Sequence, residues 1–330
     1  MKNEVIKISK MEKIFPLKGS KERLVAVDNV SFEINESETF GLIGESGSGK
    51  TTVGRCLLRL LPITSGELYF RNEEYSHISK RKYLSVLKNM QMVFQDPYYS
   101  LNPRRTVWET VDSALNAIGR SKKNERTEKI KNTLAKVYIN EETYHKYPHQ
   151  LSMGEQQRLG IARAIVSDPK FIVLDEPTSS LDISVRSEII DLLVRLQKEL
   201  GITYLFISHD LSTVQYLCHR VAIMYLGQIV ELGSVTQVFR GARHPYSVAL
   251  LSSVMHPDPK IKRSDYKLKG EIPSPINLPK ACYLASRCPE AEDICRIKPP
   301  EMHEVSAGHK VKCHFAERIR KQELTHISEN

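Results

Sequence analysis

The chain has 330 residues, enough for one large domain and a smaller one, and its 41% hydrophobic residues can form a substantial core. Its net charge of +9 suits nucleic acid, an anionic membrane face or an acidic nucleotide as partner, and equally a solvated basic surface. Because the positive residues do not gather in one block, the charge selects none of these. The sequence shows neither a signal peptide nor an apolar run approaching the roughly 20 residues of a membrane span. We therefore expect a chain that is cytoplasmic and soluble by itself.

Apolar runs and helical periodicities alternate along roughly the first 240 residues. The pattern predicts helices at 154–166 and 185–200, and strands at 5–8, 26–34, 39–43, 91–94, 171–174, 203–207 and 221–224. Such alternation implies a parallel sheet covered on both faces. A largely helical stretch at 106–138, interrupted near 119–124, separates two strand–helix blocks as an inserted subdomain would. From about Pro245 frequent prolines disfavour long helices and strands, which predicts a C-terminal extension with its own local organisation.

The loop after the strand at 39–43 has the spacing Gly44-x4-Gly49-Lys50-Thr51, which matches the phosphate-loop pattern. Its glycines keep side chains away from a backbone that must wrap a phosphate chain at close range. The helix that begins at about Lys50 directs its N-terminal dipole at the anion, Lys50 adds a positive charge, and Thr51 offers a hydroxyl to Mg²⁺. The residues predicted to bind ATP or GTP are Gly44, Glu45, Ser46, Gly47, Ser48, Gly49, Lys50, Thr51 and Thr52.

The apolar strand at 171–174 ends in two acids, Asp175 and Glu176. In a nucleotide-binding fold, Asp175 would lie at the carboxyl edge of the sheet and hold Mg²⁺ through water. Glu176 would lie one residue nearer the γ-phosphate, where it can orient and deprotonate the attacking water. Phosphoryl transfer depends mainly on such positioning and charge neutralisation. Two acids at the end of a strand are weak evidence for a catalytic site by themselves. Together with the phosphate loop they become strong evidence.

The segment Leu151-Ser152-Met153-Gly154-Glu155-Gln156-Gln157-Arg158 resembles the LSGGQ signature motif of ABC-type ATPases. In the order typical of that family, Gln95 resembles the Q-loop glutamine, Ser180-Leu181-Asp182 the D-loop, and His209 the switch histidine. The resemblance spans roughly residues 5–240. It implies the ABC-type P-loop NTPase fold of the α/β class, with a parallel sheet core, an antiparallel β subdomain and a helical subdomain at about 100–165. We expect an ATP-binding domain at 1–243 and the extension at 244–330.

The resemblance also implies a dimer with two ATP molecules between the subunits, each bound by one phosphate loop and the other subunit's signature helix. It implies catalytic roles for Glu176, for His209 at the γ-phosphate, and for Gln95, which would contact Mg²⁺ and signal to a membrane partner. A plain surface histidine and a structural glutamine are the alternatives for the last two. The remaining residues implied to contact nucleotide are Phe15, Ser152, Gly154, Glu155 and Asp182. Phe15 is a candidate for stacking on adenine, and a core phenylalanine is an equal alternative.

Met153 stands where the family usually has the first glycine of its signature. A side chain at this position is expected to crowd the nucleotide of the partner subunit and to slow hydrolysis at one of the two sites. The hypothesis predicts that Met153→Gly raises the single-site ATPase rate. Equal rates for this variant and the parent chain would contradict it.

Three features resemble one branch of the family, the ATPase subunits of oligopeptide and dipeptide importers, which also include nickel importers. They are the segments 96–103 and 244–247 and a group of four cysteines. The end of the phosphate loop, Gly-Lys-Thr-Thr-x-Gly-Arg, is closer to the F-type subunit than to its D-type sister. The resemblance implies a heterodimer with a paralogous D-type ATPase beneath two membrane permeases. An extracellular binding protein would deliver peptide, nickel or another small solute, and the chain would lie peripherally at the cytoplasmic face of the plasma membrane.

The four cysteines follow the spacing Cys282-x5-Cys288-x6-Cys295-x17-Cys313. Structural zinc sites usually contain closely spaced cysteine pairs, which this pattern lacks, and a reducing cytoplasm disfavours disulfides. Four thiolates suit a [4Fe–4S] cluster, and the extension of this importer family resembles such cluster-binding segments. Zinc and unliganded thiols remain the alternatives. Two further cysteines, Cys56 and Cys218, are expected to be buried without a chemical role.

Two other classes of protein are alternatives to a transport ATPase. Soluble ABC ATPases that act on DNA or the ribosome usually carry two cassettes, a zinc module or a long coiled-coil insertion, and these are missing from the sequence. A kinase or another P-loop enzyme needs neither the signature motif nor Asp182. We therefore expect an enzyme that converts ATP and water to ADP and phosphate, with Mg²⁺ as cofactor and without a nucleic-acid partner.

Overall fold

The computed structural model describes residues 3–17, 19, 22–118, 123–252 and 266–319. Its contacts divide the chain into two compact units, each assembled from three segments. The first unit comprises Met1–Lys7, Glu33–Thr39 and Leu68–Ser208, and the second comprises Ile8–Phe32, Phe40–Glu67 and His209–Asn330. The domain boundary expected at 243/244 divides the chain in another way and stays a prediction.

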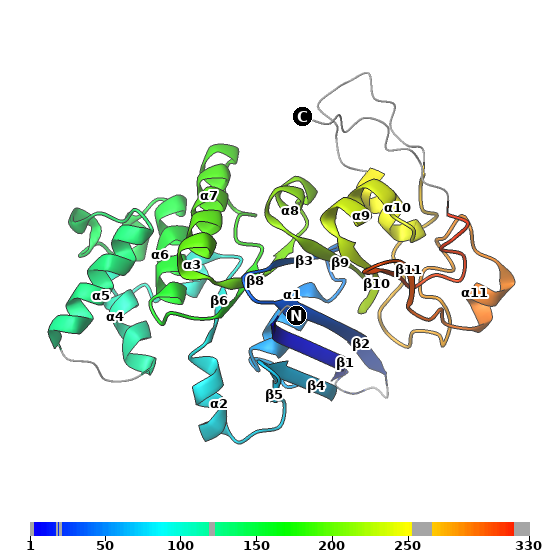
Figure 1. Ribbon diagram of the computed structural model, residues 1–330, viewed down its shortest axis with the longest axis horizontal. Coiled ribbons are helices and arrows are strands. Elements are labelled where there is room, and N and C mark those ends of the chain that lie inside the picture. The colour runs from blue at the N-terminus through cyan, green and yellow to red at the C-terminus, as the bar shows by residue number, and fades with distance from the viewer. Residues whose placement is uncertain (1–2, 18, 20–21, 119–122, 253–265, 320–330) are drawn as a thin grey trace. The chain divides into compact units, whose positions relative to one another are not determined.

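A parallel sheet with the order β8-β7-β6 lies at the centre of the first unit. Its strands are β6 (Met90–Val93), β7 (Phe171–Asp175) and β8 (Thr203–Ser208). The helices of this unit are α2 (Lys80–Leu87), α3 (Pro97–Ser100), α4 (Val107–Ile118), α5 (Lys123–Lys136), α6 (Met153–Ile165) and α7 (Ile183–Leu200), with short 3-10 turns at Glu141–Thr143 and Pro148–Gln150. Helices α4, α5 and α6 pack on one another in the green region of Figure 1. The predicted helical insertion is thereby confirmed, although 119–122 of its interruption lie outside the described residues.

Helix α7 shows how the sequence sets an element's limits. Asp182 accepts a hydrogen bond from the Val185 amide at its start, and Gly201 ends the helix in the left-handed conformation with φ 63°. Its apolar face is buried, through Ile189, Ile190, Leu192, Leu193 and Leu196. Among the residues that the structure describes, no helix combines the length and apolarity needed to cross a membrane.

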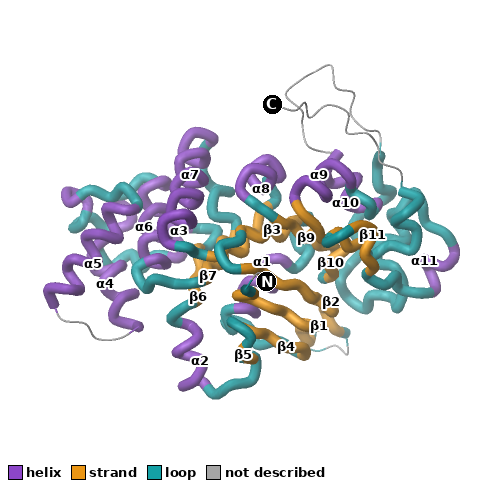
Figure 2. The backbone as a smooth tube through the Cα atoms, in the orientation of Figure 1, coloured by secondary structure: helices purple, strands orange, loops and turns teal. Residues whose placement is uncertain are grey.

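The second unit contains a mixed sheet with the order β11-β12-β10-β9-β3. Its strands are β3 (Thr39–Ile43), β9 (Arg220–Tyr225), β10 (Gln228–Ser234), β11 (His303–Ser306) and β12 (His309–Val311). Its helices are α1 (Lys50–Leu57), α8 (Leu211–Leu217), α9 (Val235–Gly241), α10 (Pro245–Ser252) and α11 (Asp293–Ile297). Strands β3 and β9 are parallel, as expected, and the three strands beyond β9 pair antiparallel. Most of 266–302 is loop in Figure 2, which confirms that the prolines prevent long elements.

A further sheet has the order β2-β1-β4-β5. Its strands are β1 (Glu4–Pro16), β2 (Arg23–Asn35), β4 (Ser65–Phe70) and β5 (Glu73–Glu74). Buried Val30, Phe32 and Ile34 alternate with more exposed residues along β2, as expected for a strand with one covered face. The strands predicted at 5–8 and 26–34 are confirmed and are longer than expected. In the loop between them, residues 18, 20 and 21 lie outside the described residues.

Strand β10 was not predicted, because a carboxylate interrupts its apolar pattern. Glu231 is fully buried in this strand. Its carboxylate accepts hydrogen bonds from the backbone amides of Arg243 (2.8 Å) and His244 (3.0 Å) and pairs with Nε2 of His309 at 2.7 Å. One buried acid thus joins β10, β12 and the segment before α10, and these bonds satisfy a group that is costly to bury alone.

The imidazole of His244 is buried, and from this burial we predict that stability depends on pH. Burial lowers its pKa from 6.5 to about 3, and the charge of Lys312 is a smaller second cause. Below pH 6.5 the unfolded chain takes up a proton that the folded chain accepts only near pH 3, so stability falls as the pH falls through this window. At pH 5 the expected loss is about 2 kcal/mol.

We expect His244→Asn to remove this pH dependence while keeping an acceptor for the Tyr246 amide, which donates to Nδ1 at 3.1 Å in the parent chain. Urea unfolding of both proteins at pH 7 and pH 5 measures the effect. His145→Asn is the matched control, since His145 is exposed. The prediction is wrong if His244→Asn loses as much unfolding free energy at pH 5 as the parent does.

Candidate nucleotide-binding and catalytic residues

The loop between β3 and α1 has a backbone conformation that glycine adopts without strain. Gly44 has φ 152° and Gly49 has φ 106°, values that residues with a side chain rarely show. A Cβ atom added to Gly44 would lie 2.2 Å from the carbonyl oxygen of Met224, and one added to Gly49 would lie 2.2 Å from that of Ala26. The glycines that leave room for a phosphate chain are therefore also required by the packing of the loop on β9 and β2.

Lys50 begins α1, and its ammonium group lies against the loop that precedes it. The residue is 5% exposed, and Nζ donates hydrogen bonds to the carbonyl oxygens of Gly44 (2.8 Å) and Glu45 (2.9 Å). The first turn of α1, which includes Thr51 and Thr52, contains no acid, so no carboxylate of that turn opposes the positive end of the helix dipole. The charge of Lys50 and the helix N-terminus therefore act together as an attractive site for phosphate.

Two residues from the C-terminal part of the chain contact Glu45, and the sequence predicted neither contact. Its backbone amide donates a hydrogen bond to the hydroxyl of Tyr246 at 2.9 Å. Its carboxylate pairs with the Arg287 guanidinium at 3.6 Å, and Arg287 also lies 5.9 Å from the ring centroid of Tyr225. Burial raises the pKa of Tyr246, so its oxygen stays a neutral hydroxyl. The segment around α10 and residue 287 therefore fixes one side of the phosphate loop.

We expect Tyr246→Phe to weaken ATP binding about threefold to tenfold, because the Glu45 amide loses its acceptor and the loop becomes less ordered. Titration with a fluorescent ATP analogue measures the effect. Tyr138→Phe is the control, since its exposed ring contacts Arg158 and Arg195 and no loop residue. Equal ATP affinities for Tyr246→Phe and the parent would contradict this role.

The carboxyl end of β7 brings together three of the predicted catalytic and metal-binding residues. Asp175 ends the strand and is 2% exposed. Glu176 follows with a φ of 46°, an uncommon value for a residue with a side chain, and its amide donates to the Ile207 carbonyl of β8 at 2.9 Å. Nε2 of Gln95 donates to Oε2 of Glu176 at 3.0 Å. The structure therefore positions the Glu176 carboxylate from both its backbone and its side chain.

The signature residues form the first turn of α6. Ser152 is the N-cap, and a reciprocal capping box joins it to Glu155: the Glu155 amide donates to Oγ of Ser152 at 3.3 Å, and the Ser152 amide donates to the carboxylate at 2.8 Å. A Cβ atom on Gly154 would lie 2.8 Å from a methyl carbon of Val185 in α7. A side chain at position 154 would therefore require Val185 to move, whereas the Met153 side chain is 42% exposed.

Three further residues were predicted to bind nucleotide or to act in catalysis, and each lies in a different part of the structure. Asp182 caps α7, where a backbone hydrogen bond from Val185 and one from the Ser184 hydroxyl lower its pKa. His209 is exposed and directly follows β8. Phe15 is half-buried on β1, with Nζ of Lys13 4.7 Å from its ring centroid. The roles predicted for all three in nucleotide binding or catalysis stay predictions.

All four C-terminal cysteines line one small cavity in the second unit, together with His244. All of their thiols are free, and the Cys282 amide donates to the Cys295 carbonyl at 2.9 Å. Burial raises the pKa of Cys288 to about 12 and that of Cys313 to about 11. Among the described residues, no group of three or more His, Cys, Asp or Glu side chains is arranged to hold a single metal ion. The two other cysteines, Cys56 and Cys218, are buried, as expected.

Comparison with known protein families gives two matches. Residues 27–179 match the family described as ABC transporter, and residues 230–295 match the family described as oligopeptide/dipeptide transporter, C-terminal region. The chain is 43% identical to the oligopeptide transport ATP-binding protein AppF of Bacillus subtilis, over 94% of this chain and 97% of AppF. It is 39% identical to the dipeptide transport ATP-binding protein DppF of Haemophilus influenzae, over 92% of this chain and 94% of DppF.

Solved structures of ATP-binding cassettes are similar as well. The dimeric, post-hydrolysis cassette MJ0796 bound to ADP and Pi matches with a TM-score of 0.63 and 28% identity, over 70% of this chain and 98% of that chain. The cassette cbiO1 from Clostridium perfringens matches with a TM-score of 0.64 and 29% identity, over 75% of this chain and 95% of that chain. These similarities confirm the predicted fold class.

Proposed function

Because this chain belongs to the family of oligopeptide and dipeptide transport ATP-binding proteins, the ATPases of ABC transporters, we propose that its ATP hydrolysis energises the import of di- or oligopeptides. The observation that carries the proposal is the match of residues 230–295 to the C-terminal region of oligopeptide/dipeptide transporters. This region lies outside the match to the general ABC transporter family, so it bears on the kind of transporter and not only on ATP binding.

The described contacts support a division of labour in hydrolysis. The loop at 44–49 and the N-terminus of α1 bind the phosphates, and Lys50 neutralises part of their charge. Thr51 and Asp175 suit Mg²⁺, which prefers oxygen ligands and, when bound, neutralises charge on the phosphates. Glu176, held by Gln95, takes a proton from the attacking water. His209 contacts the γ-phosphate in this proposal.

We propose that the working unit is a heterodimer of this chain with a paralogous D-type ATPase. It would lie at the cytoplasmic face of the plasma membrane, beneath two permeases that receive peptide from an extracellular binding protein. Ser152, Gly154, Glu155 and Asp182 would then face the nucleotide of the partner subunit. The exposed side chain of Met153 in that first turn supports unequal sites, which the Met153→Gly comparison tests.

Transport itself provides the test of cargo. Cells that lack this chain are expected to lose uptake of radiolabelled trialanine, and the parent chain but not Glu176→Gln is expected to restore it. The reconstituted complex is expected to hydrolyse ATP faster when its binding protein carries peptide. Unchanged trialanine uptake, together with lost uptake of nickel or another solute, would overturn the peptide assignment.

We also propose that the four cysteines bind a [4Fe–4S] cluster. The support is that Cys282, Cys288, Cys295 and Cys313 line the same cavity. The raised pKa values of Cys288 and Cys313 mean that these two thiols hold their protons at neutral pH, so a cluster would bind with release of protons. The cluster's place in the extension suggests a structural or redox-sensing role, since ATP hydrolysis requires no electrons.

Iron and acid-labile sulfide analysis of anaerobically purified protein, with its absorbance spectrum, tests this proposal. Four irons and four sulfides per chain are expected. Cys295→Ala should lose them, and the control Cys56→Ala, in α1, should retain them. One zinc without sulfide, or protein without metal, would overturn the cluster.

A further inference from the structure

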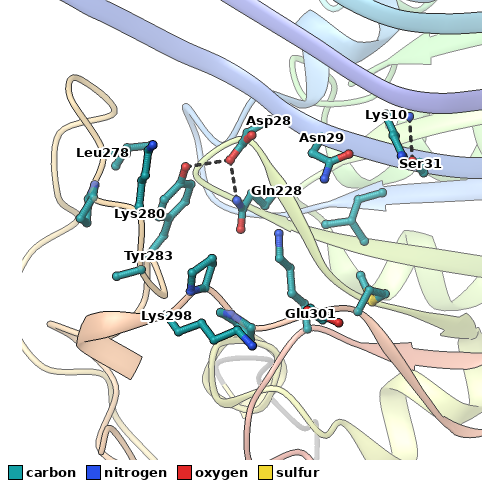
Figure 3. Close-up of a pocket in the computed structure, with 17 residues that line it drawn as sticks. Lys10, Asp28, Asn29, Ser31, Gln228, Leu278, Lys280, Tyr283, Lys298 and Glu301 are labelled. Carbon is teal, nitrogen blue, oxygen red and sulfur yellow. Dashed lines mark hydrogen bonds between the residues drawn. The ribbon is translucent and has the colours of Figure 1, made fainter. Parts of the chain in front are cut away.

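A cleft of about 720 Å³ opens in the second unit beside β1, β2 and β10 and the C-terminal segment (Figure 3). This volume lies within the range of small-molecule sites. None of the residues predicted to bind nucleotide or iron lines the cleft. Its charged lining consists of four lysines and two acids, namely Lys10, Lys280, Lys298, Lys312, Asp28 and Glu301.

The lysines leave the cleft with an excess of positive charge. In the part of the chain that the structure describes, none of the four ammonium groups forms an ion pair with a carboxylate. Asp28 is held by neutral donors instead: Oδ2 accepts hydrogen bonds from Oη of Tyr283 at 2.7 Å and from Nε2 of Gln228, as Figure 3 shows. Lys312 is half-buried. An anion in the cleft would offset the cost of burying its charge.

The rest of the lining is largely apolar and partly rigid. Pro299 and Pro300 have fixed φ angles, and they line the cleft with Leu278, Tyr283 and Met302. Lysines on an ordinary solvated surface are not expected to surround a concave apolar wall. A ligand that satisfies both parts has at least two anionic groups on a small organic body.

We propose that this cleft binds a small organic anion with at least two phosphate or carboxylate groups. Each lysine supplies a mobile point charge with three donors, which suits phosphate and carboxylate oxygens alike. The wall also touches the nucleotide loop through one residue: Gly227 accepts a hydrogen bond from the Asp28 amide and donates one to the Ser48 carbonyl, both at 2.9 Å. Binding must therefore be measured with the nucleotide site saturated by Mg²⁺-ADP.

Calorimetric titration of the full chain at fixed salt tests the proposal, with fructose 1,6-bisphosphate as the phosphate probe and citrate as the carboxylate probe. We expect one of them to bind at one site with a Kd of about 10–100 µM. Lys312→Met and Lys280→Met should each weaken binding about tenfold, and Glu301→Gln should strengthen it, because it removes a negative charge from the wall. The control is Lys310→Met, since Lys310 is exposed, lies two positions from Lys312 and does not line the cleft.

Three outcomes would overturn the site. In the first, neither probe shows saturable binding up to about 5 mM. In the second, Lys310→Met weakens binding as much as Lys312→Met, which would indicate a general charge effect. In the third, Lys50→Met abolishes binding and the cleft variants do not, which would place the anion in the phosphate loop. Thermal unfolding checks that each variant is folded, and Lys298→Met replaces Lys312→Met if the latter is not.

Discussion

Glu176→Gln is expected to reduce ATP turnover at least about 100-fold while ATP still binds. Glutamine has the shape of glutamate and can still accept the hydrogen bond from Gln95, which is 3.0 Å long in the parent chain. It cannot take a proton from water at neutral pH, so the step that fails is the chemical one. Phosphate release measured beside ATP-analogue binding separates these two effects.

The matched control for this prediction is Glu142→Gln, an exposed glutamate in the 3-10 turn at Glu141–Thr143. Its turnover should equal that of the parent chain. If Glu176→Gln kept more than about a tenth of the parental rate, the general base would have to be another group. If it lost ATP binding as well, Glu176 would act in binding and not in the chemical step alone.

The sequence predicted the parts of this molecule that depend on short-range patterns. The phosphate loop is one continuous segment, and its glycine spacing follows from the positive φ angles of Gly44 and Gly49. The buried strands β7 and β8 are uninterrupted apolar runs, so their positions were predicted almost to the residue. Gln95 and Glu176 were each predicted as catalytic residues, and they lie close together because β6 and β7 are parallel neighbours whose carboxyl ends meet at one edge.

The parts that the sequence could not predict join residues far apart in the chain. Glu45 and Tyr246 are 201 positions apart, and no local pattern relates a loop amide to a tyrosine hydroxyl. Strand β10 was missed for a related reason, because Glu231 is compatible with burial only through partners from β12 and the segment before α10. The cleft depends on Lys10 and Lys312, which line the same cavity although they are far apart in the sequence. The sequence did not predict the positive charge of this cleft, because the lysines are dispersed along the chain.

Lys50→Met is expected to weaken ATP binding at least about 100-fold, and hydrolysis should fall with it at subsaturating ATP. The side chain is 5% exposed, so its charge acts on phosphate oxygens with little screening by water. Methionine has a similar length and keeps the packing of the stem, but it donates no hydrogen bond to the carbonyl oxygens of Gly44 and Glu45. The variant therefore removes both the charge and a restraint on the loop.

Lys50→Arg separates these two contributions, because it keeps the charge but replaces a compact ammonium with a planar guanidinium that does not fit the same carbonyl pair. We expect it to bind ATP more weakly than the parent and more tightly than Lys50→Met. Lys7→Met is the control, since Lys7 is exposed on β1, and its ATP affinity should not change. Parental affinity in Lys50→Met, measured by ATP titration on protein with an unchanged circular dichroism spectrum, would show that the helix N-terminus and the loop amides hold the phosphates without this lysine.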